Sequence, residues 1–396
     1  MPASGGTVLQ QIGEERRYSG QPNALVRVRL VRTALELQSL RPEWQRLHSE
    51  AAVASMFNDW AWQAAWWRLY GRERELQVIV ATRGDKTVGI LPLYAQTTTQ
   101  LGLPVRMLRL LGEGGDTYPD DLGPLFARGE EAELAIMLAT AMLRLPSYDV
   151  AALADIDASS EFPAALAATA QLAQLRCSLG RAQRIACLRL PDDWNDFLAS
   201  VSGHRRAQIR QKRLNLEREH RTRFFVWNDA ERLGAAVLRL AELHRKRWGA
   251  ASSAFASAEY RELHLATMRD ALARDRLRLY CLEIGGDLAA MLYAYRLREH
   301  IFLVQAGFNP QYARWSPGSV LLEYALEHAI TEGNHALDFL RGEHRYKERL
   351  ATHWRETVSV TVCRPTIAAA AFRARKVYVA RTNAKVRNFA KSVSLP

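Results

Sequence analysis

The chain carries the same hydrophobic pattern twice. Residues 76–94 and residues 277–295 each form two apolar runs around a short polar turn that contains glycine and aspartate. Such a turn between strand-like runs indicates a β-hairpin, because it needs backbone conformations with positive φ. With Gly84 aligned on Gly285 the copies are offset by 201 residues, and helical sequence precedes both. The pattern therefore predicts a duplicated helix-helix-hairpin-strand-helix unit.

Other elements follow from hydrophobic period and capping residues. Apolar and charged residues alternate at 26–31, which predicts a strand. Asn58 or Asp59 can cap a helix that runs to Tyr70, and we expect its tryptophans, Trp62 and Trp66, to pack in the core and at the domain interface. The remaining predicted elements are helices at 130–145 and 320–330 and strands at 148–153, 186–190, 300–306 and 336–340.

Length and composition favour two domains. The chain has 396 residues, 48% of them hydrophobic, which is enough for more than one core. We expect a disordered leader at 1–23, an N-terminal α/β domain at 24–190, a C-terminal α/β domain with the chemistry at 191–363, and a basic helical tail at 364–396. The four cysteines lack metal-ligand spacing, so the prediction includes no metal site and no disulfide framework.

Positive charge gathers in two segments. The formal net charge is +12, and residues 364–396 contain eight basic residues and no acidic one, while residues 203–223 contain eight basic and two acidic residues. This pattern suits a phosphorylated ligand together with a tail on an anionic membrane, and it also suits nucleic acid. A loosely docked tail is an equal alternative. No apolar run is long enough to span a bilayer, so we expect a cytoplasmic protein, with peripheral contact at the inner membrane through the tail.

One loop has the composition of an anion-binding site. A strand that contains Gln305 leads into a loop with Arg314, Ser316, Gly318 and Ser319, and a helix follows. These five residues are the candidate contacts of a cofactor. Free amides and the dipole at a helix N-terminus favour a phosphate, and glycine lets the backbone come close to it. An ordinary helix start capped by Ser316 is the alternative.

Ionisable residues crowd into residues 338–349, at the end of a predicted strand. Acyl transfer to an amine needs a base and a donor that stabilises the oxyanion. Glu343 or Asp338 is the candidate base and Tyr346 the candidate acid, while Lys347 or Arg341 is the candidate phosphate or oxyanion contact. Substrate contacts are also expected from Arg205, Arg206 and Arg210 of the basic helix, and an acidic loop with Asp116, Tyr118 and Asp120 is a candidate for selecting an amine.

These motifs resemble a known family. The stretches concerned are Arg205–Arg210, Gly307–Pro310, Ser316–Gly318, Asp338–Lys347 and the hairpin that ends at Leu93. Together they resemble the CelD-like branch of the GNAT acyltransferase superfamily, which is related in fold to Fem-type aminoacyltransferases. The resemblance implies two tandem GNAT-like domains, each a mixed, mostly antiparallel sheet flanked by helices, with acyl-CoA (acetyl-CoA) as co-substrate. The sequence departs from the family's usual Arg/Gln-x-x-Gly-x-Gly/Ala motif, because Trp315–Ser319 contains one glycine.

The sequence as a whole predicts an acyltransferase that moves an acyl group from acyl-CoA to an amine or hydroxyl of a polysaccharide or envelope precursor or a related small molecule. Two alternatives stay open: a Fem-like transferase with an aminoacyl-tRNA donor, and a non-catalytic regulator or scaffold of polysaccharide synthesis. Nucleic-acid binding as the main function is disfavoured.

Overall fold

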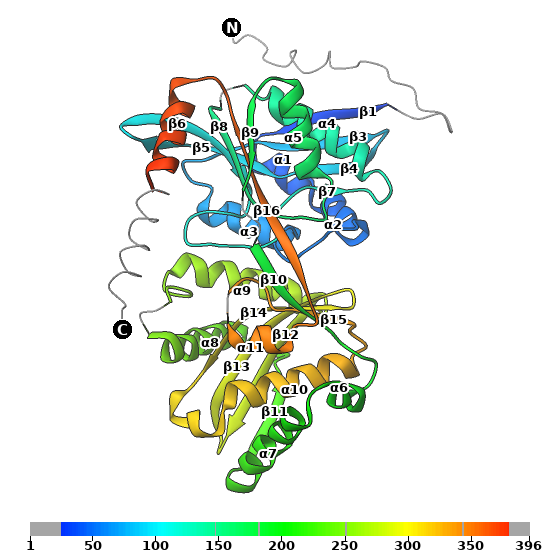
Figure 1. Ribbon diagram of the computed structural model, residues 1–396, viewed down its shortest axis with the longest axis vertical. Helices are drawn as coiled ribbons and strands as arrows, with labels where there is room; N and C mark the ends of the chain where they lie inside the picture. Colours follow the sequence, from blue (N-terminus) through cyan, green and yellow to red (C-terminus); the bar gives the residue numbers. More distant parts are fainter. Residues whose placement is uncertain (1–24, 147, 181–182, 250–251, 343, 380–396) are drawn as a thin grey trace, which may run out of the picture.

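The computed structural model shows an elongated molecule with an upper and a lower α/β half (Figure 1). It describes residues 25–146, 148–180, 183–249, 252–342 and 344–379. The expected leader at 1–23, the end of the expected tail and Glu343 lie outside the described residues.

The first half of the chain folds as predicted around the first hairpin, β3–β4. Asp59 caps α3 by accepting a hydrogen bond from the amide of Ala61, and the hairpin turns at Gly84, whose φ is 60°. Its elements are β1 (Val26–Val31), α1 (Ala34–Ser39), α2 (Arg41–Glu50), α3 (Trp60–Tyr70), β2 (Glu75–Leu76), β3 (Val78–Arg83), β4 (Lys86–Leu91), β5 (Leu93–Gln100), β6 (Leu103–Leu110), β7 (Leu125–Phe126), α4 (Glu131–Arg144), β8 (Val150–Asp157), α5 (Phe162–Leu172) and β9 (Arg176–Leu179).

The second half repeats this order around the second hairpin, β12–β13. Its elements are β10 (Gln183–Arg189), α6 (Trp194–Ser200), α7 (Gly203–Glu219), β11 (Thr222–Val226), α8 (Leu233–Trp248), α9 (Ala258–Ala273), β12 (Leu277–Ile284), β13 (Asp287–Leu297), β14 (His300–Phe308), the 3-10 helix η2 (Pro310–Trp315), α10 (Pro317–Thr331), β15 (Ala336–Asp338), α11 (Arg345–Leu350) and β16 (His353–Cys363). Helices precede each hairpin; β5, β6 and β7 lie between the first hairpin and α4, and β14 lies between the second hairpin and α10. Both halves thus contain the unit that the duplicated pattern predicts.

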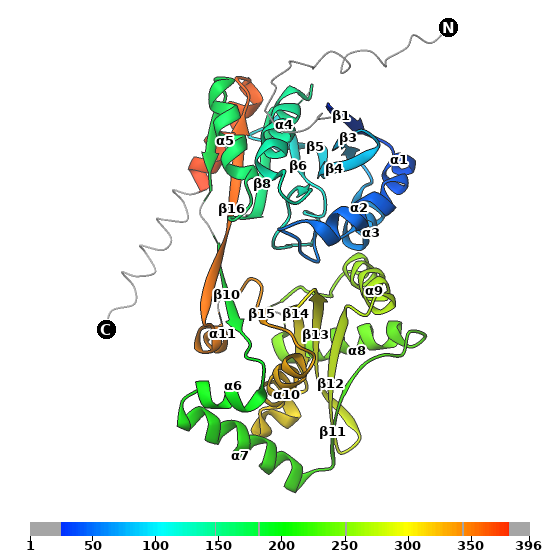
Figure 2. The ribbon, with the colours of Figure 1, turned by 90° about the vertical axis from the view of Figure 1, so that its right-hand side faces the viewer.

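Strand β16 links the two halves. Its first residues pair with β10, and from Thr357 onward it pairs with β8, while β9 pairs with its end at 360–363. Figure 2 shows this strand running from the lower half into the upper half. The strands thereby form one twelve-stranded sheet, in the order β11-β12-β13-β14-β15-β10-β16-β8-β6-β5-β2 with β9 on β16, beside a four-stranded sheet β1-β3-β4-β7.

A second link lies at the start of α3. The buried carboxylate of Asp59 accepts hydrogen bonds from Arg274, at 2.7 Å, from Arg276, at 2.9 Å, and from the hydroxyl of Tyr295, at 3.1 Å. Trp62 and Trp66, on the same helix, are buried in a hydrophobic core that includes residues of both halves. The tryptophan cluster therefore packs at the core, as predicted.

The segment after β16 begins as a docked helix. Residues 367–379 are helical, and Ala369 is buried with Val105 and Val150 of the upper half. Phe372 packs against the same cluster. Among the described helices, none is both long enough and apolar enough to cross a bilayer.

Candidate functional site

The site opens where β14 and β15 separate. These parallel strands pair only from His300–Phe302 to Ala336–Asp338, and β14 then continues alone to Phe308. A register shift at Val304 in the β13–β14 pairing bends β14 at this point. Two cavities lie beside the exposed end of β14, one toward α10 and one toward the upper half.

The first, which we call the basic cavity, has a volume of about 1130 Å³ and lies between α7, β14 and the start of α10. Four cationic side chains line it, namely Arg205, Lys212, Arg247 and Arg349. Among the described residues no aspartate or glutamate lines it. Of the four, Arg205 has an acidic partner, the buried Glu323, at 3.4 Å. Such a cavity favours an anionic ligand.

The predicted anion-binding loop forms part of the basic cavity. Ser316, Gly318 and Ser319 line it, with Ser316 in the left-handed conformation (φ 54°) immediately before α10. A Cβ on Gly318 would lie 3.3 Å from the ring of Phe308, so a larger residue would crowd this wall. Arg314 lies outside the lining, because its guanidinium pairs with Glu219 at 2.6 Å.

The second, which we call the aromatic cavity, has a volume of about 410 Å³ and lies between the two halves. Its lining includes Gln305 and the aromatic residues Phe57, Trp62, Tyr118, Trp248, Tyr260, Phe339 and Tyr346. Asp116, Asp120 and Arg341 also line it. Gln305, which we expected to contact the cofactor, therefore lies in this cavity and not in the basic one.

The two cavities meet at a shared wall. Four residues line both, namely Arg247, Leu292, Ala306 and Tyr346. A phenol is protonated at neutral pH, and partial desolvation raises the pKa of Tyr346 further. A molecule in one cavity can thus meet a molecule in the other beside a protonated phenol and a guanidinium.

Gly307 sets how closely helix α8 approaches β14. A Cβ at Gly307 would lie 2.3 Å from the amide nitrogen of His244, closer than any real contact. The absence of a side chain lets α8 pack directly on the strand, which places Arg247, one turn further along, at the junction of the cavities.

Lys347 is buried at the end of β15, on the wall of the aromatic cavity. Its ammonium donates hydrogen bonds to the carbonyl oxygens of Phe339, Leu340 and Arg341, at 2.8, 3.1 and 2.7 Å. Burial lowers its pKa to about 8. These hydrogen bonds use all three ammonium protons of Lys347. The fold therefore explains the burial of this side chain without a bound substrate.

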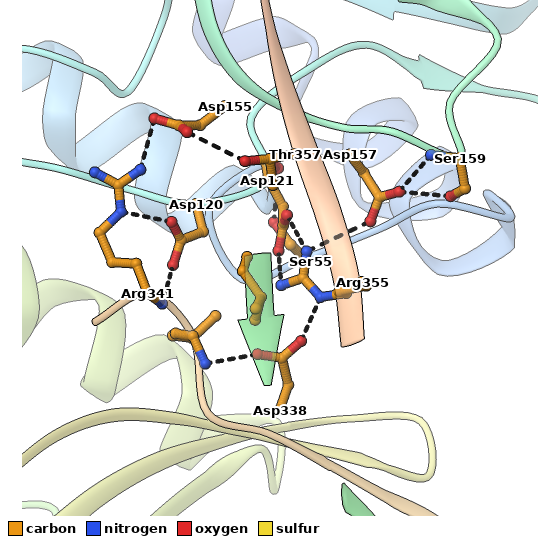
Figure 3. A network of polar contacts seen from close by, with 12 residues as sticks. Ser55, Asp120, Asp121, Asp155, Asp157, Ser159, Asp338, Arg341, Arg355 and Thr357 are labelled. Carbon is orange, nitrogen blue, oxygen red and sulfur yellow. Dashed lines mark hydrogen bonds and ion pairs between the residues drawn. The ribbon is translucent and has the colours of Figure 1, made fainter. Parts of the chain in front are cut away.

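A network of five aspartates and two arginines joins the halves next to this wall (Figure 3). The amide and the guanidinium of Arg341 both bond to Asp120, at 2.8 and 2.7 Å, and the guanidinium also pairs with Asp155 at 2.6 Å. Arg355, on β16, binds both oxygens of Asp121, at 2.5 and 2.6 Å. The fifth aspartate, Asp157, lies 3.6 Å from Arg355.

Asp338 belongs to this network. Its carboxylate pairs with Arg355 at 2.5 Å and accepts the amide of Leu340, a residue with φ 51°, at 2.6 Å. It lines neither the basic nor the aromatic cavity. Asp338 therefore holds the turn after β15, and this position does not favour the role of base that we considered for it.

The basic helix α7 turns one face to the basic cavity. That face carries His204, Arg205, Gln208 and Lys212, whereas Arg206 and Arg210 are absent from the described lining. Among the three arginines expected to contact substrate, the structure thus brings Arg205 to the site. Sequence reasoning missed Arg247, because the run Arg245-Lys246-Arg247 also suits the C-terminal turn of any helix.

Comparisons with known proteins agree with this architecture. Residues 203–348 match the model of the family described as Acetyltransferase (GNAT) domain. The match covers α7 to α11, which contribute most of the basic cavity. The second half of the chain is thus similar to a GNAT acetyltransferase domain, and the two α/β halves agree with the predicted fold of two GNAT-like domains.

Solved structures cover most of the chain at low identity. FemX matches with a TM-score of 0.55 and 10% identity over 81% of this chain and 95% of its own. A conserved protein of unknown function from Bacteroides thetaiotaomicron VPI-5482 matches with 0.51 and 12%, over 85% of this chain and 100% of its own. L-PGS from Bacillus licheniformis matches with 0.50 and 11%, over 85% and 95%. No curated protein sequence matches.

Proposed function

We propose that the chain is an acyltransferase that takes an acyl group from a coenzyme A thioester in the basic cavity. The observation that carries this proposal is the charge of that cavity: four cationic side chains and a helix start line it, and no described acidic residue does. The phosphates of coenzyme A would lie against Arg205, Lys212 and the first turn of α10. The thioester would then reach toward the junction with the aromatic cavity.

The reaction would take place at that junction. An acceptor amine enters from the aromatic cavity and attacks the thioester carbon, so that a C–N bond forms and, when the tetrahedral intermediate collapses, the C–S bond breaks. Tyr346 lines both cavities and is protonated at neutral pH, so it can donate a proton to the leaving thiolate and regain one from the acceptor nitrogen. We keep Glu343 as a candidate base, while Asp338 and Lys347 position the loop after β15.

Ligand-dependent melting tests the donor. Acetyl-CoA and longer acyl-CoA thioesters should raise the melting temperature with concentration, because a ligand that binds the folded state stabilises it by mass action. The paired substitution Arg205→Gln and Lys212→Gln should remove most of this shift. The matched control is Arg206→Gln with Arg210→Gln, two arginines of the same helix outside the described cavity lining. An equal loss in both double variants, or no shift in the wild type, would overturn the proposal.

The alternatives make different predictions. The hypothesis of a Fem-like transferase with an aminoacyl-tRNA donor predicts RNA affinity that falls steeply with salt, and no response to acyl-CoA. A scaffold predicts neither response.

A polysaccharide or envelope precursor as acceptor stays a prediction, since it rests on the family resemblance. The tail as a membrane contact also stays a prediction; the described part of its helix packs on the upper half through Ala369 and Phe372.

A further inference from the structure

Two opposite charges line the aromatic cavity, and neither has an oppositely charged partner among the described residues. Most ionisable residues of its lining are accounted for: Asp120 pairs with Arg341, and Lys347 donates its protons to three carbonyls. Burial lowers the pKa of the lining histidines His244, His264 and His344, which are therefore neutral at pH 7. Asp116 and Arg247 remain.

The carboxylate of Asp116 has no cationic partner in the described part of the chain. Its carboxylate accepts hydrogen bonds from the hydroxyl of Tyr70, at 2.5 Å, and from the hydroxyl of Ser257. Both donors are neutral, and no lysine, arginine or histidine of the described chain lies within ion-pair distance. The two hydroxyls fix the carboxylate in place at the wall of the cavity and leave its charge available to a cation.

Arg247 is the matching cation at the other end, where the cavities meet. Its guanidinium lies over the rings of Trp248, at 4.4 Å, and Phe308, at 5.2 Å, and in the described part of the chain it has no carboxylate or hydrogen-bond partner. Burial lowers its pKa, yet an arginine stays protonated at neutral pH. A planar guanidinium held by stacking presents its fork of N–H groups to a carboxylate.

The floor of the cavity contains further unsatisfied polar atoms. His264 is 1% exposed and lines the cavity, and neither of its ring nitrogens has a partner among the described residues. Buried polar groups without partners are costly, so these atoms indicate a ligand with hydrogen-bonding groups.

We propose that the aromatic cavity binds an amino acid with a basic side chain, or a peptide end of the same chemistry, as the acyl acceptor. Its carboxylate lies on Arg247 and its side-chain cation on Asp116. This inference rests on the proposed function, because Arg247 lies at the junction: a carboxylate bound there brings the α-amine, attached to the adjacent carbon, next to the thioester. The aromatic walls cover the aliphatic part of the side chain.

Calorimetric titration of the full chain without any donor tests this. The probes are L-lysine, cadaverine, which lacks the carboxylate, and L-norleucine, which lacks the side-chain cation. The wild type should bind lysine about tenfold or more tightly than either analogue, since each charge-assisted contact contributes about that factor. Asp116→Asn should weaken lysine to the level of norleucine and leave norleucine unchanged. Arg247→Gln should weaken lysine to the level of cadaverine and leave cadaverine unchanged.

Equal affinity for all three probes in the wild type, or an equal loss for all three in either variant, would overturn the inference. Arg247→Lys retains the charge without the fork and should give an intermediate affinity for lysine. The melting shift with acetyl-CoA, measured on Asp116→Asn, checks that the basic cavity is intact, because Asp116 lines the aromatic cavity and is absent from the described lining of the basic one. Lysine binding without an acyl-CoA response would overturn the donor assignment alone, and an acyl-CoA response without selective lysine binding would overturn the acceptor assignment alone.

Discussion

At the scale of single residues, Lys347 shows how a charged side chain can serve the fold at the edge of a reaction site. Replacing it with methionine would remove the donors to three carbonyl oxygens at the end of β15. We expect Lys347→Met to lower the free energy of unfolding by roughly 1–3 kcal/mol, the cost of leaving buried acceptors unpaired. Urea denaturation measures this change.

Arg345→Met provides the matched control, because Arg345 is an exposed cation on the same short helix, α11. It should leave the free energy of unfolding within about 0.5 kcal/mol of the wild type. If Lys347 instead contacted substrate in the way that its sequence neighbourhood suggested, Lys347→Met would abolish turnover with an unchanged urea midpoint.

His264 predicts how stability depends on pH. Burial lowers its pKa from 6.5 to about 3, so below pH 6.5 the unfolded chain binds a proton that the folded chain does not. The associated stability is complete above pH 6.5 and is lost as pH falls toward 3. Between pH 7 and pH 5 this residue should account for a loss of roughly 2 kcal/mol in the free energy of unfolding.

The variant His264→Leu isolates that contribution. Between pH 7 and pH 5 its free energy of unfolding should fall less than that of the wild type, by roughly 2 kcal/mol. Other buried groups, such as His48, contribute equally to both proteins. Parallel pH profiles for the two proteins would show that His264 is protonated in the folded state.

At the scale of elements, Arg355 on β16 forms ion pairs with both halves of the molecule. It binds the buried carboxylates of Asp121 and Asp338, which come from opposite halves. Removal of one partner from a buried ion pair leaves uncompensated charge and costs about 3–5 kcal/mol. We therefore expect Arg355→Met to lower the free energy of unfolding by that amount in urea titrations.

The neighbouring strand β10 supplies the control. Arg189 lies on β10 with an exposed side chain, and Arg189→Met should change the free energy of unfolding by less than about 0.5 kcal/mol. Similar midpoints for Arg355→Met and the wild type would mean that the carboxylates around Arg355 are protonated or hydrated in the folded protein.

Local pattern was sufficient to predict most elements. Several elements lie where hydrophobic period and turn residues predict them. They are the hairpins at Gly84 and Gly285, the capped helix after Asp59 and the strand that contains Gln305. Each of these signals lies within a few neighbouring residues, so it can be read without the fold. The repeat of the same signals predicts the duplication, whereas the GNAT-like fold of the two halves was an implication of the family resemblance.

The partners of charged residues were not predictable in this way. Arg355 meets Asp121 across 234 residues, and Arg341 meets Asp120 across 221. No local spacing encodes such pairs, so the dense run of charges at 338–349 could not show that its members Asp338 and Arg341 form ion pairs between the halves. Arg247 was missed because its distinguishing feature is the lack of an acidic partner among the described residues. That feature depends on the fold and cannot be recognised from neighbouring residues in the sequence.

At the scale of the whole molecule, the two halves should unfold together. They share one hydrophobic core, a continuous sheet through β16 and the contacts of Asp59 with Arg274 and Arg276. Domains joined by so much buried structure cannot separate without exposing it, so we expect one calorimetric transition with equal calorimetric and van't Hoff enthalpies.

Paired cavity-forming substitutions sharpen this prediction, because each damages only one half. Leu138 is fully buried on α4 of the upper half and Leu326 is buried on α10 of the lower half. Replacing either leucine with alanine should cost about 2–5 kcal/mol and move the single transition to lower temperature as a whole. If the halves were independent, each substitution would instead split the trace and leave one component at the wild-type temperature. A split trace would mean that β16 can leave one sheet while it stays paired in the other, and the junction of the two cavities would then open and close with the relative motion of the halves.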